Sequence, residues 1–363
     1  FRAAGADSWV ARRPIRERTL AHEIAHQWWG NLVGWRSYRD QWLSEAMADH
    51  AALLYLDRAG ARGSEGYLAE LAAGWRGSLG TRLRDGRTLE SVGPLVLGER
   101  LNSSKAGEAY RAIVYRKGSV VLATLARSLG ERPFLAMNRA LVDAARGHVL
   151  STEVFLESME RMSGRDLGEF AANYVYGTGI PEVFYTYRIE NDDEDGWVVR
   201  GRATQSSSHD DRHRAIETAD GGWDVLRERV EHLDVATSDL LVPLRVELHP
   251  VEVTDADREP RRRRDRKRRE RAAAPPVANL EGMVRVRGRE QEFEIPVPGR
   301  PRRLEFDPRG EILANFHSES VAPKQVLHHH ARNVAGSGEH GRAEELYLRA
   351  LAAPSEFDDR TSR

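Results

Sequence analysis

The stretch TLAHEIAHQWWG, residues Thr19–Gly30, places two histidines and a glutamate on one short apolar segment. No proline or glycine occurs from Ile15 to Trp29, and the apolar residues recur at helical spacing, so the sequence predicts a helix that ends at Gly30. Residues four apart share one face of a helix. His22 and His26 would therefore point the same way, and both imidazoles could reach one metal ion.

Glu23 follows the first histidine and would project about 100° around the helix from it. A carboxylate in that position can hold a water molecule beside the metal, which is the chemistry of the H-E-x-x-H pattern. Histidines that are simply buried and hydrogen-bonded on an apolar helix would give the same five residues. A third ligand from a separate element would distinguish the two interpretations.

The segment YRDQWLSEAMADHAALLYLDRAG predicts a second helix, with Asp40 as its N-cap and Gly60 at its end. Glu45 lies early on this helix, and eighteen residues separate it from His26. Two histidines and one glutamate leave the fourth position of a tetrahedral zinc ion open, which is the catalytic arrangement.

Two further residues follow on the second helix. Asp49 lies one turn after Glu45, and its carboxylate could accept the spare N–H of a ligating histidine. His50 is expected to be structural or exposed.

Three blocks of sequence resemble a known family. HEIAHQWWGNLVGW and WLSEAMADH resemble the M1 zinc metallopeptidases, the gluzincin aminopeptidases, whose signature is H-E-x-x-H, eighteen residues and then E. AYRAIVYRKGSVV resembles the family segment that ends in Y-x-K-G, and FAANYVYGTGIPEVFYTY resembles the junction with a following β domain. The Y-x-K-G match implies that Tyr115 stabilises the transition state, with Tyr110 as the weaker candidate. Without the resemblance, Tyr115 would be interpreted as a packing residue at the start of a helix over residues 117–129.

The resemblance implies a multidomain α+β fold. We expect residues 1–180 to form a mostly helical, thermolysin-like catalytic domain. Short alternating segments over residues 181–320 predict an antiparallel β-sandwich; these segments are FYTYRI, GWVVRGRA, LLVPLRVELHP, EGMVRVRG, EFEIPVPG and RRLEF. Residues 321–363 are expected to form a C-terminal helical segment. Its spacing of Ala343, Tyr347 and Ala350 is compatible with a tetratricopeptide-like unit and a protein partner, or with a single helix that packs on the β domain.

The function implied is that of a zinc peptidase acting on peptide or protein N-termini. One Zn²⁺ per chain would be bound by His22, His26 and Glu45, with Glu23 as general base and Tyr115 as oxyanion donor. Trp28 and Trp29 would belong to the core.

The chain departs from the family pattern at several positions. Ser44 replaces the usual Asn before the glutamate ligand, and Ala46 replaces the usual Gly after it. The family's Gly-x-Met-Glu-Asn segment, which binds the substrate α-amine, is absent upstream of His22, so we expect a chain that lacks the family's N-terminal part. A zinc endopeptidase or another hydrolase with the same site, and an inactive peptidase-like interaction module, remain as alternative functions.

Composition excludes some classes. The chain carries 55 basic and 56 acidic residues, so no overall preference for nucleic acid follows. It has no cysteine, which excludes disulfides and cysteine-ligated zinc. No apolar run reaches the roughly 18 residues of a membrane span. Localisation stays open.

Two clusters of basic residues are not expected to be binding sites. Nine of the eleven residues 261–271 are basic, and we expect a disordered solvated loop near 255–277 rather than a nucleic-acid site. The triplet His328–His330 is expected to be a surface cluster near a helix start.

Overall fold

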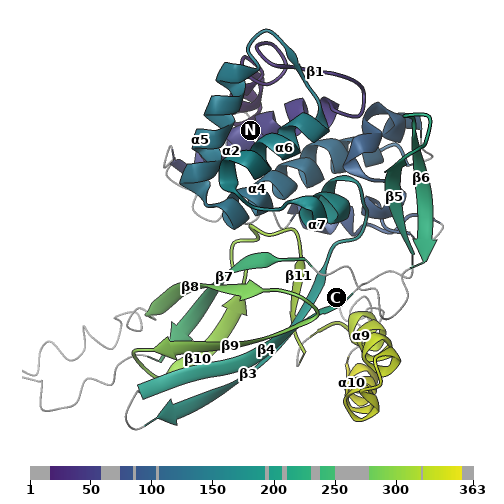
Figure 1. The fold of residues 1–363 in the computed structure, drawn as a ribbon. Helices are drawn as coiled ribbons and strands as arrows, with labels where there is room; N and C mark the ends of the chain where they lie inside the picture. Colours follow the sequence, from purple (N-terminus) through teal and green to yellow (C-terminus); the bar gives the residue numbers. More distant parts are fainter. Residues whose placement is uncertain are drawn as a thin grey trace, which may run out of the picture.

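The computed structural model describes residues 17–58, 74–84, 87–103, 106–192, 196–206, 211–229, 238–249, 278–319 and 322–353. Helices make up the N-terminal part, two sheets follow it, and a pair of helices ends the described chain (Figure 1). The basic run 261–271 and the expected loop around it lie outside the described residues.

The N-terminal part is built from short helices around α4. Besides the helices of residues 17–25 and 74–79, its elements are α2 (Gln41–Arg58), η1 (Glu90–Val92), η2 (Leu95–Ser103), the π-helix η3 (Arg111–Lys117), α4 (Gly118–Leu129), α5 (Glu131–Ala144), α6 (Thr152–Ser163), α7 (Gly168–Phe170) and the π-helix η4 (Ala171–Val175). Two short strands, β1 (Gly34–Trp35) and β2 (Val149–Leu150), pair in parallel.

The helix that carries the histidine pair is shorter than predicted. It covers residues 17–25, and the chain then continues in turns, in which Gly30 adopts a φ of +119°. A Cβ at position 30 would also lie 2.8 Å from Ser44 Oγ, so this turn needs glycine. Trp29 is buried as expected, but Trp28 is 50% exposed, and its assignment to the core was wrong.

Asp40 directly precedes α2, but its side chain does not cap that helix as predicted. Its Oδ2 accepts hydrogen bonds from the backbone N–H and the hydroxyl of Ser37. Its Oδ1 accepts from the backbone N–H and the hydroxyl of Thr152, the first residue of α6. The buried carboxylate therefore ties the start of α2 to the positive end of another helix.

Seven strands form two sheets below the helices. The four-stranded sheet has the order β11-β3-β4-β9 and the three-stranded sheet the order β10-β7-β8. Their bounds are β3 (Glu182–Asp192), β4 (Gly196–Ser206), β7 (Leu240–Leu248), β8 (Asn279–Val286), β9 (Glu290–Val297), β10 (Pro301–Phe306) and β11 (Asn315–Ser318). The prediction of a purely antiparallel β-sandwich was wrong at one edge, because β11 pairs with β3 in parallel.

A separate hairpin, β5 (Asp211–Glu217) and β6 (Trp223–Arg229), lies against the helical part (Figure 1). Arg214 forms a bridge with Gly177, and the ring of Trp223 stacks on Tyr176 at 5.5 Å between centroids. The Cζ atom of Arg39 lies over the indole ring of Trp223, 3.6 Å from the ring centroid. This hairpin therefore belongs by contact to the helices, although it follows β4 in the chain.

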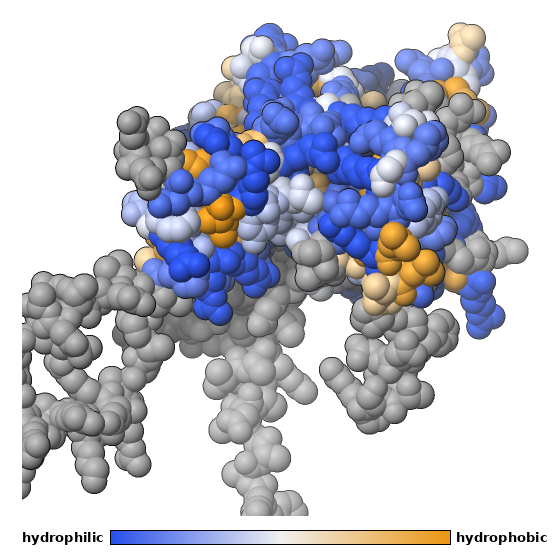
Figure 2. Space-filling view, turned by 90° about the horizontal axis from the view of Figure 1, so that it is seen from below, coloured by the Kyte–Doolittle hydropathy of each residue, from blue (hydrophilic) through white to orange (hydrophobic). Residues whose placement is uncertain are grey.

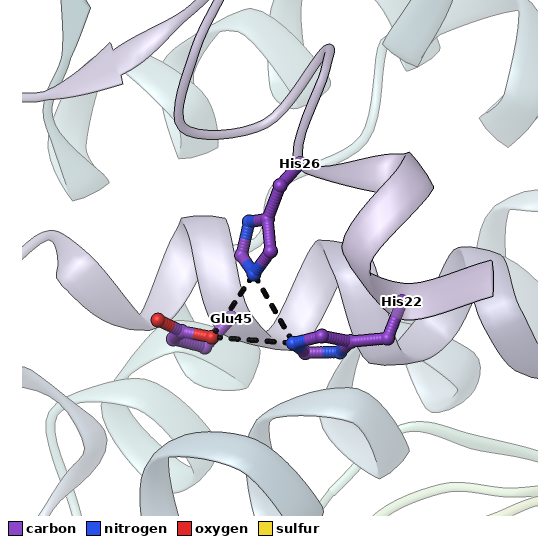
Figure 3. A group of neighbouring side chains, drawn as sticks. All are labelled: His22, His26 and Glu45. Atoms are coloured by element: carbon purple, nitrogen blue, oxygen red, sulfur yellow. Dashed lines mark hydrogen bonds and ion pairs between the residues drawn. The ribbon is translucent and has the colours of Figure 1, made fainter. Parts of the chain in front are cut away.

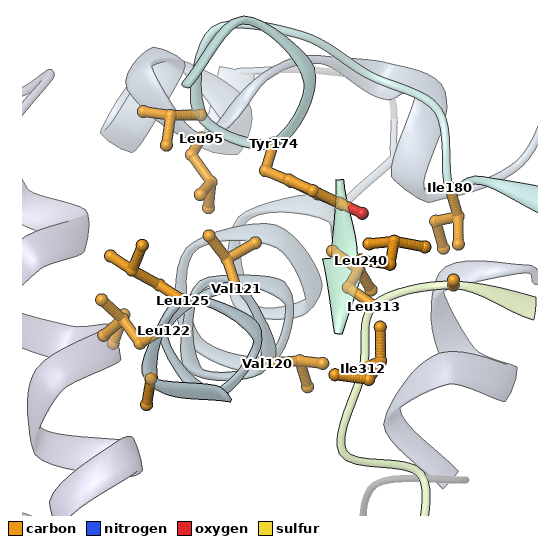
Figure 4. Packing of buried hydrophobic residues seen from close by; sticks show 14 of the residues in the cluster. Leu95, Val120, Val121, Leu122, Leu125, Tyr174, Ile180, Leu240, Ile312 and Leu313 are labelled. Atoms are coloured by element: carbon orange, nitrogen blue, oxygen red, sulfur yellow. The ribbon is translucent and has the colours of Figure 1, made fainter. Parts of the chain in front are cut away.

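One apolar core joins the helical part to the sheets. Val120 of α4 lies beside Ile312 and Leu313 in the loop before β11, and Leu240 of β7 lies next to Leu313 (Figure 4). All four are at most 3% exposed. The domain boundary near residue 180 stays a prediction.

The C-terminal segment contains two helices, α9 (Lys324–Gly336) and α10 (His340–Ala352), which pack on each other and on Phe184 of β3. Ala343 and Ala350 are buried in that contact. The surface interpretation of the histidine triplet was wrong for His330, which is 1% exposed and stacks on Phe184 at 3.7 Å. Its Nε2 also lies 3.3 Å from Glu319, a partner that sequence spacing did not indicate.

Seen from the side of the sheets and the C-terminal helices, the surface is mostly hydrophilic, with apolar colour in small separate patches (Figure 2). Among the described residues, no helix combines the length and the apolar character that crossing a bilayer requires.

The Asp40 contacts lead to a prediction about stability. Replacing Asp40 by Ala should lower the free energy of unfolding by at least about 3 kcal/mol, because a hydrogen bond to a charged group contributes about 1.5–3 kcal/mol and four are lost. Asp40→Asn should cost less, since an amide oxygen can still accept from the N–H of Thr152. Urea unfolding of both variants measures the difference. Equal stability of Asp40→Ala and the parent protein would contradict the role given to this carboxylate.

Candidate metal centre

Three side chains from two helices converge on one point (Figure 3). His22 Nε2 and His26 Nε2 lie 3.1 Å apart. Glu45 Oε2, from α2, lies 3.5 Å from His22 Nε2 and 3.4 Å from His26 Nε2. The side chains are 12%, 22% and 14% exposed, respectively, so the group is largely buried and still open on one side.

The spacing of these three atoms fits a tetrahedral metal ion. Zinc bonds of about 2.0–2.1 Å to nitrogen and oxygen place neighbouring ligand atoms roughly 3.3–3.4 Å apart. The three observed separations bracket that value. Among the described residues this is the one group of three or more potential ligands close enough to share an ion.

The outer nitrogens of both histidines are occupied. His22 Nδ1 lies 2.9 Å from Asp49 Oδ1, and His26 Nδ1 lies 2.8 Å from the backbone oxygen of Trp29. Both acceptors favour the tautomer with the proton on Nδ1, which leaves each Nε2 lone pair directed at the shared point. Ser44 donates a hydrogen bond to the same Trp29 oxygen at 2.9 Å and lies 3.3 Å from His26 Nδ1.

The local field favours a cation. Burial would lower the pKa of His22, but the hydrogen bonds and charges of Asp49 and Glu45 outweigh it and raise that pKa to about 9. Two carboxylates therefore create a site that attracts positive charge. A divalent ion would take the place of the proton, because a ligating imidazole must be neutral.

Arg18 is a member of this group that sequence reasoning missed. Its Nη1 lies 3.2 Å from Asp49 Oδ1, the same oxygen that contacts His22. The signal was present, because Arg18 lies four residues before His22 and so on the same helix face. Ser44 was noted only as a departure from a pattern, and its contact with the Trp29 oxygen could not be foreseen.

Tyr115 lies beside the three ligands, and Glu23 is next to one of them in the sequence. Glu23 is exposed and follows His22 on the same helix, on the side that solvent reaches. The ring of Tyr115 stacks beside that of His22, with 6.1 Å between centroids and 21° between planes. Burial raises the pKa of Tyr115 well above its usual value, and the charge of Glu45 raises it further, so the phenol remains a hydrogen-bond donor.

Tyr110, the second candidate, lies edge-on to Tyr115 at 5.8 Å between ring centroids. Burial and the charge of Glu45 also raise its pKa. Tyr115 is the one of the two whose ring lies against His22, so it is the better placed.

Tyr115 lies in the π-helix η3 rather than at the start of α4. The next element begins at Gly118, where a Cβ would lie 2.7 Å from the Cβ of Ala46 on α2. The glycine therefore lets η3 and α4 approach α2 directly beside Glu45. Because residue 118 is a glycine, there is room for the methyl group of Ala46, at the position where the family usually has glycine.

His50 is a buried structural residue and is not exposed, which settles the open choice. It is 6% exposed and lies edge-on to Phe134 at 5.8 Å. Burial lowers the pKa of His50 to about 4, so it stays neutral.

Comparison with known proteins finds similarity to a peptidase family and to aminopeptidases. Residues 8–174 match the model of the peptidase family M1 domain. Aminopeptidase O of Rattus norvegicus is 27% identical over 206 residues, covering 50% of this chain and 24% of its own. Aminopeptidase M1 of Arabidopsis thaliana is 30% identical over 174 residues, covering 45% of this chain and 18% of its own. The chain thus spans about a quarter or less of the length of these relatives.

A solved structure shares the fold. The aminopeptidase A of Legionella pneumophila, crystallised in complex with aspartic acid, matches with a TM-score of 0.51 and 16% identity, over 89% of this chain and 29% of that one. The family match begins before the histidine helix and ends within the last helical segment before β3. Residues 8–174, which carry this centre, therefore match the domain of peptidase family M1.

Proposed function

We propose that this chain carries the active site of a zinc aminopeptidase, which removes residues from the N-termini of peptides. The observation that carries the proposal is the 3.1–3.5 Å spacing of the three ligand atoms, with both outer imidazole nitrogens held by acceptors. The match to peptidase family M1 implies zinc, and the donor set of two imidazoles and one carboxylate is that of catalytic zinc. A zinc ion held there supplies a Lewis acid and lowers the pKa of a water towards about 7.

Glu23 and Tyr115 have complementary proposed roles. The exposed Glu23 carboxylate accepts a proton from the attacking water and passes it to the leaving amine. Tyr115, protonated because burial raises its pKa, donates a hydrogen bond to the carbonyl oxygen as negative charge develops there. His22, His26 and Glu45 hold the metal, while Asp49 and Arg18 fix the orientation of His22.

The metal assignment predicts about one zinc ion per chain after dialysis against zinc, measured by elemental analysis. A His22→Ala, Glu45→Ala double variant should bind none, because one remaining imidazole cannot hold the ion. The exposed His328 on α9 provides the matched control, and His328→Ala should keep the metal. Stoichiometric zinc in the double variant would exclude this centre.

The general-base role predicts that Glu23→Gln keeps zinc and fold but lowers kcat by about 10²- to 10⁴-fold, because an amide cannot accept the proton. The readout is hydrolysis of aminoacyl-arylamides by the zinc-loaded protein. Glu157→Gln, at an exposed glutamate of α6, should leave turnover unchanged. N-acetylated substrates should not be cleaved. Cleavage of blocked substrates as fast as free ones would indicate an endopeptidase instead.

The role of Tyr115 predicts that Tyr115→Phe lowers kcat by about 10²- to 10³-fold with little change in KM, because the lost hydrogen bond forms only in the transition state. Tyr110→Phe is the matched control and should have a much smaller effect. If the two variants exchange these results, Tyr110 is the oxyanion donor and the assignment to Tyr115 is wrong.

A further inference from the structure

A buried ion pair lies behind the segment that carries Tyr115. Lys117 Nζ donates to Glu90 Oε1 at 2.6 Å, and the two side chains are 0% and 1% exposed. Lys117 also donates to the backbone oxygen of Gly177 at 3.2 Å. The backbone N–H of Gly179 donates to both oxygens of Glu90, at 3.1 and 2.9 Å. The pair thus joins three segments far apart in the sequence: η3, η1 and the turn before β3.

A buried ion pair is a poor source of net stability in a core. Removing two charges from water costs several kcal/mol per ion, and well-packed apolar residues are often as stable or more so. What the pair provides is fixed geometry, because each charge is held by directional bonds to backbone atoms on a second segment. The structure therefore gives this pair the properties of an anchor rather than of a simple source of stability.

The anchor acts on the segment that presents Tyr115. Lys117 and Tyr115 lie two residues apart in η3, so their side chains leave the segment on nearly opposite sides. Tyr115 faces His22, and Lys117 faces Glu90. Gly118, the next residue, is in contact with α2 and leaves no space for a Cβ. A shift of η3 towards the centre is blocked by that contact, and a shift away is opposed by the ion pair.

We propose that Lys117 and Glu90 are positioning residues that set the place of the Tyr115 hydroxyl relative to the metal centre. This inference rests on the proposed function of Tyr115 as oxyanion donor. A displacement of about 1 Å in a catalytic group can cost 10²-fold in rate, so loss of the anchor should lower kcat through Tyr115 and leave the metal ligands in place.

The test is a double-mutant cycle on the zinc-loaded protein. Lys117→Met should lower kcat by about 10- to 10²-fold with little change in KM and with zinc retained. In a Tyr115→Phe background the same substitution should have almost no further effect on kcat, because the hydroxyl it positions is already gone. Glu90→Gln, which keeps the shape of the side chain, provides a second variant if Lys117→Met does not fold.

A second readout does not depend on activity. The protein labelled with 3-fluorotyrosine should give a single sharp ¹⁹F resonance for Tyr115, assigned by its absence in Tyr115→Phe. Lys117→Met or Glu90→Gln should shift or broaden it. If the parent protein has no peptidase activity, the proposed function fails while this resonance still tests the positioning role.

The matched control is the ion pair between Arg76 and the fully buried carboxylate of Asp307, at 3.0 Å. Asp307→Asn should lower stability without changing the Tyr115 resonance or the kcat. An unchanged Tyr115 resonance in both anchor variants would overturn the proposal. A loss of kcat from Lys117→Met that is equally large in the Tyr115→Phe background would also overturn it.

Discussion

The close approach of the histidine helix to α2 is the constraint on which the centre depends. It brings three ligand atoms within 3.5 Å of one another, a spacing that a shared cation would stabilise. Asp49 and the Trp29 oxygen contact the Nδ1 atoms, which face away from the shared point, and so orient the two imidazoles. Gly30 leaves room for the Ser44 hydroxyl at the point where the chain turns back.

A second contact extends this arrangement to the tyrosine. Gly118 packs against Ala46, one residue after the glutamate ligand, so the start of α4 and the π-helix before it are placed by the same helix that supplies Glu45. The apolar face of α4 then continues into the sheets through Val120 and Leu313. The centre, the tyrosine and the β part of the molecule are thus linked through α2 and α4 without an intervening flexible connection in the described residues.

The sequence predicted that these three side chains converge, because the information for it lies in short-range spacing. His22 and His26 are related by helical spacing, and the distance to Glu45 belongs to a recognisable pattern. The contacts that hold them are not local in this sense. Asp40 was expected to cap its own helix, but its Oδ1 accepts hydrogen bonds from Thr152, the first residue of α6, 112 positions away. Burial of His330 depends on Phe184 of β3, and no spacing within the triplet encodes that.

The prediction of secondary structure also succeeded where the sequence signal is local and failed where it is not. Strands with clear alternation, such as β4 and β7, were predicted at nearly their observed positions. The hairpin β5–β6 was missed, and so was β11, whose four residues are too few to carry a period. The histidine helix ended at residue 25, and the absence of proline and glycine before Gly30 could not reveal the turns that follow it.

The central claim is that His22, His26 and Glu45 form one zinc site. Anomalous diffraction at the zinc edge, on crystals of the zinc-loaded protein, tests it most directly. We expect one strong peak about 2.0–2.1 Å from His22 Nε2, His26 Nε2 and Glu45 Oε2. A peak elsewhere, for example at His328–His330, or no peak between the two helices, would contradict the account.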